Sequence, residues 1–278
     1  MTDRVDQGFD YLPPAAAGLG HVFARPKWVA AACVVALAGL GWLALGVIAA
    51  GNTSLAAAID AICHGSPAAA PLTVRGAVLV AAMWAAMVLA MMLPSAAPMI
   101  LTYAEIADTA ARKGEPVVSP LVLAAGYTMV WLGFAAVATL AQLALTRLAP
   151  LEGNPAITRA LISGAIFVGA GLYQFSALKH ACLTQCRSPF PFFFTHWTTA
   201  ARGVFRLGLT QGLICVGCCW AIMLLMLTIG AMNVIWMAGL GIVMTAEKQG
   251  TGQRFSRAIG VALIAGGVIV AAAGIAIP

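Results

Sequence analysis

The chain has 278 residues, of which 62% are hydrophobic and only 9% are charged. These proportions lie far outside the range of soluble domains, so the composition predicts an integral membrane protein surrounded by lipid. The formal net charge of +6 does not indicate a nucleic-acid partner, because the basic residues stand in short segments between apolar runs rather than along one exposed face.

The first residues predict a cytoplasmic tail rather than a cleaved signal peptide. Asp3, Asp6 and Asp10 occur where a signal peptide carries positive charge. Prolines and small residues follow, so we expect residues 1–27 to form a flexible tail. Residues 28–278 are then expected to form one transmembrane helical domain.

Charge-free apolar runs follow the tail, each long enough to cross about 30 Å of hydrocarbon at about 1.5 Å per residue. They begin near Trp28, Gly76, Ser119, Ala160, Leu207 and Ala258. The run 207–246 is about twice the needed length, and residues 230–233 near its middle supply the flexible break of a hairpin. We therefore predict an all-α, polytopic bundle of about seven spans.

The distribution of basic residues predicts the orientation of these spans. If the N-terminus is cytoplasmic, all of the 15 Lys and Arg residues except Arg75, Arg147 and Arg159 fall on the cytoplasmic side. This strong positive-inside bias places the C-terminus outside and suits the cell inner membrane. Gly208 and Gly212 in the fifth span are four residues apart, a spacing that indicates close approach of two helices.

The second span carries methionines four residues apart, at Met83, Met87 and Met91, so that one helix face holds all three thioethers. Pro94 and Pro98 are expected to break this helix at its cytoplasmic end. A methionine stripe alone is typical of core packing, because methionine fills irregular gaps. At this depth, however, it would lie level with a second group of sulfur atoms in the fifth span.

That second group is a stripe of polar and sulfur side chains at helical spacing, which we expect to point into the bundle. It consists of Gln211, Cys215, Cys218, Cys219, Met223 and Met226. Counted from Arg206, Cys215 lies about 14 Å into the membrane, near its midplane. Buried free cysteines are also small hydrophobes. Clustered thiolates with thioethers, however, favour copper(I), or zinc where thiolates dominate.

A third cluster, Lys179, Cys182 and Cys186, follows the fourth span and shares one helix face if the helix continues. Its cytoplasmic position keeps thiols reduced, and an ammonium nearby favours the metal-binding thiolate. His180 and His196 lie in the same segment and are candidates to complete a site. A docking point for metal on the outer side is the remaining candidate. It would consist of Asp60, Cys63 and His64.

These motifs, in this order, resemble the family of predicted metal-binding integral membrane proteins of bacteria and archaea, a domain of unknown function. The resemblance rests on Ala90-Met91-Met92-x-Pro94-Ser95-x2-Pro98, Gly126-Tyr127, Tyr173-Gln174-x4-Lys179-x2-Cys182-x3-Cys186, Cys215-x-Gly217-Cys218-Cys219-Trp220 and Glu247-Lys248. It implies a membrane-embedded binder of a soft metal, with the Cys and Met motifs as ligands.

The leading hypothesis is therefore a copper(I)-handling membrane protein, not an enzyme. It would transport the metal or hold it for a metallochaperone or metalloenzyme partner. One alternative is a membrane thiol oxidoreductase, because Cys215 and Cys218 have redox spacing. Another is a structural or accessory subunit of a membrane complex, in which Cys, Met and Gly serve only close helix packing.

Overall fold

The structure is a computed structural model that describes residues 26–49, 74–148, 155–229, 234–250 and 252–276. Within these ranges the chain is helical and contains no strand, so the predicted all-α class is confirmed. Residues 1–25 of the predicted tail lie outside the described residues, as do the predicted hairpin break 230–233 and the outer group Asp60, Cys63 and His64.

The helices follow one another with short connections. They are α2 (Pro26–Ala49), α4 (Val74–Met87), the π-helix η2 (Val88–Met92), α5 (Leu93–Arg112), α6 (Pro120–Leu148), α7 (Pro155–Tyr173), α8 (Ala177–Arg187), α9 (Pro189–Thr195), α10 (Ala201–Leu224), α11 (Met226–Ile229), α12 (Val234–Lys248) and α13 (Gly252–Ala276). Four of them, α2, α6, α7 and α9, begin with proline, whose fixed φ suits the first helical position. Gly114 and Gly250 follow α5 and α12 with φ of 78° and 97°, a conformation that favours glycine.

Among the described residues, 5 helical segments are long and apolar enough to cross a membrane, and up to 6 if a bent pair counts as one span. They are Trp28–Val47, Val74–Arg112, Pro120–Leu145, Ala201–Thr228 and Gly252–Gly274, and the bent pair joins α7 to α8 at 64°. Helix α12 has 15 residues and is shorter than these. The total of about seven spans, and the orientation of the termini, stay predictions.

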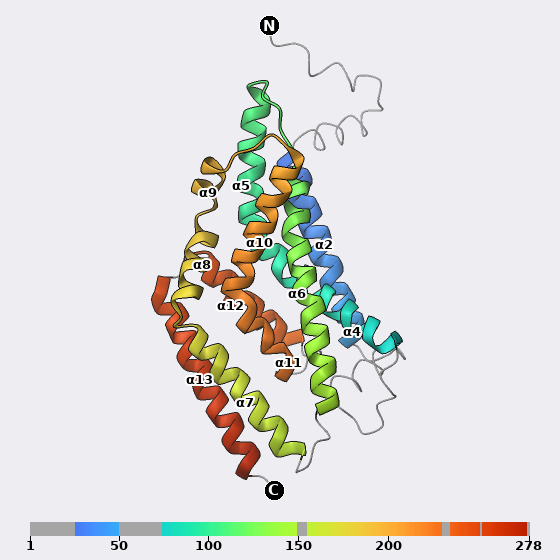
Figure 1. Ribbon diagram of the computed structural model, residues 1–278, viewed down its shortest axis with the longest axis vertical. Coiled ribbons are helices and arrows are strands. Elements are labelled where there is room, and N and C mark those ends of the chain that lie inside the picture. Colours follow the sequence, from blue (N-terminus) through green and yellow to red (C-terminus); the bar gives the residue numbers. More distant parts are fainter. Residues whose placement is uncertain (1–25, 50–73, 149–154, 230–233, 251, 277–278) are drawn as a thin grey trace.

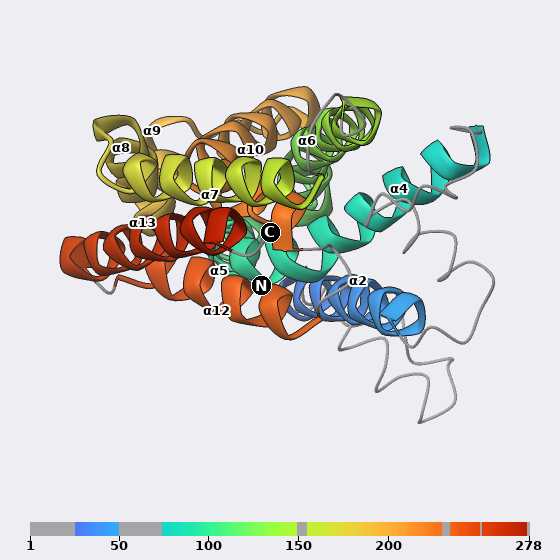
Figure 2. The ribbon, with the colours of Figure 1, turned by 90° about the horizontal axis from the view of Figure 1, so that it is seen from below.

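The helices form one elongated bundle (Figure 1). Helices α2, α5, α6 and α10 run roughly along its long axis, while α7 and α13 lie side by side on one flank in both views (Figures 1 and 2). Helix α2 begins toward one end of the bundle and α13 finishes at the other (Figure 1). Helices α8, α10 and α12 come together in the interior, next to the site described below.

The prediction that Pro94 and Pro98 break the second span is wrong, because α5 runs from Leu93 to Arg112 straight through both prolines. Pro94 has no N–H for the carbonyl of Ala90, four residues earlier, and the π-helix η2 widens the chain at this point. The indole Nε1 of Trp42 donates to that carbonyl oxygen at 3.0 Å. The acceptor that proline leaves free is thus satisfied by α2, and the helix continues.

Helices α6 and α10 touch at glycines, as the spacing of Gly208 and Gly212 predicts. A Cβ atom on Gly208 would collide with the carbonyl oxygen of Leu123, and one on Gly212 would lie 2.9 Å from Cβ of Val130. The close approach is therefore confirmed. It brings α6, with Tyr127, against the cysteine-bearing face of α10.

Replacing Gly208 with alanine is expected to destabilise the protein by about 1–3 kcal/mol, since the new methyl group meets backbone rather than a movable side chain. The apparent melting temperature in mild detergent should fall accordingly. Gly133→Ala on α6 is the matched control, because a Cβ there has no atom within 4 Å. Equal melting temperatures for the two variants would contradict the close contact of α6 with α10.

Candidate metal centre

Three thiols of α10 form the middle of the site. Cys215, Cys218 and Cys219 are each 1% exposed, and their Sγ atoms all lie within 4.8 Å of one another. The spacing of three and four residues places them on one helix face. Cys218 Sγ lies 3.3 Å from Cys219 Sγ and donates to the carbonyl oxygen of Cys215 at 3.2 Å.

The whole predicted stripe of α10 is buried, so the prediction that this face points into the bundle is confirmed. Its further members are Gln211, Met223 and Met226, which are 3%, 0% and 1% exposed. The amide nitrogen of Gln211 has no hydrogen-bond partner among the described residues. The burial of these residues does not depend on metal, and their role as ligands stays a prediction.

Helix α8 adds a fourth thiol from a different part of the sequence. The chain bends by 64° after α7, and Ser176 caps the new helix by accepting a hydrogen bond from the backbone N–H of Lys179 at 3.1 Å. This turn sets α8 against α10, with Cys186 Sγ 3.7 Å from Cys218 Sγ. Cys182 Sγ packs on Gly217, where a Cβ atom would lie only 2.6 Å away.

We call Cys186, Cys215, Cys218 and Cys219 the cysteine centre. Cys182 lies beside it, half-buried on the same face of α8 as Cys186. All five cysteines are free thiols in the structure. The two groups that the sequence suggests separately, one in the fifth span and one after the fourth, therefore meet in one place.

A lysine from α12 contacts the cysteine centre. Lys248 Nζ donates to Cys215 Sγ at 3.0 Å and to Ser95 Oγ at 2.7 Å. Ser95 in turn donates to the carbonyl oxygen of Met92 at 2.8 Å. An ammonium in this position stabilises negative charge on sulfur, and thiolate is the form of cysteine that binds metal.

A tyrosine from α6 reaches the same sulfur atom. The hydroxyl oxygen of Tyr127 lies 3.0 Å from Cys215 Sγ and 3.1 Å from the carbonyl oxygen of Met92, and the side chain is 2% exposed. Cys215 is thus held by groups from α6 and α12. Metal ligands fixed by such surrounding contacts keep their orientation and bind more tightly than mobile ones.

The ammonium of Lys179 does not serve the thiols, contrary to the interpretation of the sequence. Lys179 Nζ pairs with Glu247 Oε2 at 2.8 Å, and both side chains are 1% exposed. Arg187 Nε donates to the backbone carbonyl of Glu247 at 2.9 Å. These contacts tie α8 to the end of α12, and so hold Lys248 in place beside Cys215.

The predicted methionine stripe is buried in the core, with Met83 and Met87 at 0% and Met91 at 3% exposure. The side chain of Met91 packs against Gly241 of α12, since its Cε atom would lie 3.6 Å from a Cβ there. The carbonyl oxygen of Met92, by contrast, lies in the network around Cys215. A ligand role for the three thioethers therefore stays a prediction.

The two histidine candidates are exposed, away from the cysteine centre. His196 stacks on Phe192, and its Nδ1 lies 2.8 Å from the hydroxyl of Thr195. His180 lines a separate cavity between α8 and α13. The structure therefore brings together sulfur ligands without adding a nitrogen donor from either histidine.

A cavity of ≈430 Å³ adjoins the cysteine centre. Its lining includes Cys186 and Lys248, the two side chains that contact Cys218 and Cys215, together with Ser95, Met99 and Arg187. Sulfur, ammonium and guanidinium groups thus border one space next to the thiols. Such a space gives a soft ion a path to the ligands that avoids the tightly packed interior.

The geometry suits a single metal ion. A metal–thiolate bond measures about 2.3 Å, so two sulfur atoms on one ion stand at most about 4.6 Å apart. The separations within 4.8 Å among the α10 thiols approach this limit and need little movement. Thiolate ligands select copper(I) or zinc, whereas magnesium and calcium require oxygen ligands.

The profile of one protein family, described as PpoB2, copper chaperone, matches residues 81–270, which include all the residues of the cysteine centre. The chain belongs to this family. Membership in the PpoB2 copper chaperone family supports the prediction of a copper-related, metal-handling protein. The chain has no match among the curated proteins or the solved structures.

Interpretation of the sequence missed the roles of Lys248, Tyr127, Ser95 and Glu247, although each lies in a motif of the resemblance. Lys248 counts there only toward the positive-inside bias. Its signal is that Glu247 and Lys248 directly follow an apolar run, where a charged pair can fold back against the bundle. The contacts themselves join residues 33 and 153 positions apart, which helical spacing does not predict.

Proposed function

We propose that this PpoB2 protein holds copper(I) at the cysteine centre inside the membrane and delivers it to a copper-requiring partner enzyme or a metallochaperone. The observation that carries the proposal is the buried trio Cys215, Cys218 and Cys219 with Lys248 Nζ 3.0 Å from Cys215 Sγ. Thiolates are the soft ligands that copper(I) prefers. The protein acts in this proposal as a carrier and not as an enzyme.

Charge balance favours copper(I) over zinc at this site. Two thiolates with one copper(I) carry a net charge of −1, which the ammonium of Lys248 neutralises. Four thiolates with zinc would leave −1 even after Lys248 is counted, and buried net charge is costly. Cys186 is only half-buried and lies 3.7 Å from Cys218, so it suits a ligand that exchanges during transfer.

The cavity beside Cys186 and Lys248 serves in this proposal as the path by which copper(I) enters and leaves. Met99 in its lining offers a weaker, thioether ligand on the way to the thiolates. Cys182 lies at the edge of the same group of thiols. The buried thioethers of Met83, Met87, Met91 and Met223 are proposed as further soft ligands inside the bundle.

The membrane placement is part of the proposal. We infer a multi-pass protein of the inner membrane with its N-terminus in the cytoplasm, a topology supported by the apolar helices and by the distribution of basic residues. The cavity beside Cys186 then opens toward the cytoplasm. Copper(I) would be accepted in a reducing compartment, where thiols stay free.

Titration of the anaerobically purified protein with copper(I), in competition with a coloured copper(I) chelator, tests this function. We expect stoichiometric binding that zinc in excess does not displace. The loaded protein should then transfer copper(I) to an apo copper protein faster than free exchange through the chelator. Zinc binding that excludes copper(I) would contradict the proposed metal, and retention of copper(I) in the presence of acceptors would contradict delivery.

Replacing Lys248 with methionine is expected to weaken copper(I) binding by about 10–100-fold, because the negative charge of the metal–thiolate group loses its partner. The same competition titration measures the change. Lys113→Met removes an exposed lysine at the end of α5 and is the control. Unchanged affinity in Lys248→Met would show that the ammonium does not act on the metal.

A membrane thiol oxidoreductase is the second candidate, favoured by the 3.7 Å separation of Cys186 Sγ from Cys218 Sγ. Oxidation of these two thiols to a disulfide would release two electrons and two protons to a quinone or to a partner disulfide. Bound quinone in the purified protein, or a mixed disulfide trapped with a partner, would support this candidate. Thiols that stay reduced during copper transfer would remove it.

A further inference from the structure

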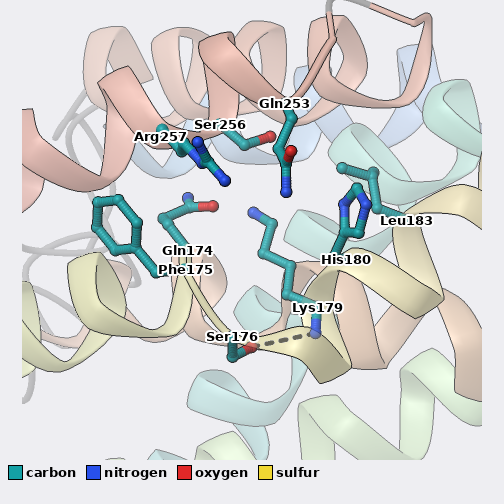
Figure 3. A pocket seen from close by; sticks show the side chains of 9 residues that line it. All are labelled: Gln174, Phe175, Ser176, Lys179, His180, Leu183, Gln253, Ser256 and Arg257. Atoms are coloured by element: carbon teal, nitrogen blue, oxygen red, sulfur yellow. Dashed lines mark hydrogen bonds between the residues drawn. The ribbon is translucent and has the colours of Figure 1, made fainter.

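A second cavity lies between the bend that joins α7 to α8 and the first turns of α13, with a volume of ≈320 Å³ (Figure 3). Its lining consists of Gln174, Phe175, Ser176, Lys179, His180, Leu183, Gln253, Ser256 and Arg257. Gln174, Lys179, Gln253 and Arg257 direct their polar ends toward the same space (Figure 3). None of the lining residues is a cysteine, and the function proposed above does not use the cavity.

Buried polar atoms in this cavity lack partners in the part of the chain that the structure describes. Gln174 is 6% exposed, and both its amide nitrogen and its amide oxygen are without a hydrogen bond. The hydroxyl of Ser256, 5% exposed, is also without one. Since unsatisfied buried polar groups are costly and rare in folded proteins, these three atoms indicate a bound polar ligand.

The groups that border the cavity are mainly hydrogen-bond donors with positive charge. Arg257 contributes a guanidinium group and Gln174 and Gln253 contribute amides, and no Asp or Glu is among the lining residues. Glu247 neutralises Lys179, so the unpaired positive charge comes from Arg257, and from His180 when protonated. A fork of guanidinium donors beside amide and hydroxyl groups matches the oxygens of a phosphate.

We propose that this cavity is a binding site for a phosphate group, with Gln174, Ser256 and Arg257 as its principal contacts. The group has two sources, the headgroup of an anionic phospholipid and free phosphate. Apolar surface next to the site suits the first, because Phe175 is 48% exposed and Leu178 is 62% exposed. Acyl chains can lie along these side chains while the headgroup enters the cavity.

Binding of two probes tests the site, each on the full-length protein in mild detergent. The first probe is phosphatidylglycerol, compared with phosphatidylcholine and counted per protein by native mass spectrometry. The second is inorganic phosphate, measured by equilibrium dialysis with radiolabel. Arg257→Gln removes the charge of the site, and Gln174→Leu removes the unpartnered amide. Arg254→Gln is the matched control, because Arg254 is exposed on the same helix and does not line the cavity.

We expect Arg257→Gln and Gln174→Leu each to weaken binding by about tenfold or more, as for loss of a charge-assisted or buried hydrogen bond, with Arg254→Gln unchanged. Preference for phosphatidylglycerol identifies the lipid as the source, and saturable binding of phosphate without lipid preference identifies the free ion. Equal losses in Arg254→Gln and Arg257→Gln would overturn the proposal, since they indicate general surface attraction. Binding of neither probe would also overturn it and leave a cavity filled by water.

Discussion

Replacing Lys179 with methionine is expected to lower the free energy of unfolding by about 3–5 kcal/mol, the typical loss when one partner of a buried ion pair is removed. Lys179 and Glu247 are each 1% exposed, and their charged atoms lie 2.8 Å apart. The variant leaves the carboxylate of Glu247 buried without its counter-charge. The apparent melting temperature in mild detergent, and the yield of folded protein from membranes, measure the effect.

The double variant Lys179→Met with Glu247→Leu is the internal control for this prediction. Because no charge is then left buried, it should recover most of the lost stability. Lys113→Met, at an exposed position, should leave the melting temperature unchanged. A single variant as stable as the parent would contradict the view that this ion pair ties α8 to α12.

Replacing Cys215 with serine is expected to weaken copper(I) binding by at least about 100-fold, more than the loss caused by altering a group that only supports a ligand. Cys215 Sγ lies within 4.8 Å of the other two α10 thiols and contacts both Lys248 and Tyr127. A hydroxyl is a poor ligand for a soft ion. Copper(I) affinity from competition with a coloured chelator is the measurement.

Cys33→Ser separates loss of a metal ligand from loss of any thiol. Cys33 is a free, half-buried cysteine of α2, far along the chain from the cysteine centre. Copper(I) affinity in this variant should equal that of the parent protein. If Cys215→Ser and Cys33→Ser bind copper(I) equally well, Cys215 is not a ligand.

The parts of the site that lie on one helix could be predicted from the sequence. The positions of Gln211, Cys215, Cys218 and Met223 fix one face through the helical repeat, and the structure buries that face. The close approach at Gly208 follows from the same kind of reasoning, because only glycine leaves room for another backbone. Both conclusions need no knowledge of how distant helices meet.

Contacts between helices could not be predicted in this way. The 64° bend after α7 turns α8 against α10 and joins Cys186 to Cys218, but nothing in the spacing of these residues states their separation in space. Lys179 has a cysteine on its own helix face, yet it pairs with Glu247 of α12. The ammonium that contacts a thiol is instead that of Lys248.

The error about the prolines of the second span has the same origin. A proline inside a helix leaves one carbonyl without its backbone donor, and on the isolated sequence this predicts a break. In the structure the indole of Trp42, on another helix, donates to Ala90 and compensates for the loss at Pro94. Whether proline ends a helix therefore depends on the neighbour that packs against it.

The central claim is that a copper(I) ion binds at the cysteine centre. Elemental analysis of the protein purified anaerobically in mild detergent, beside a variant with Cys215, Cys218 and Cys219 all replaced by serine, tests it most directly. We expect stoichiometric copper in the parent and none in the variant, with equal yield of folded protein. Equal copper in both proteins, or none in the parent even after copper(I) loading, would contradict the claim and favour a role of these cysteines in helix packing.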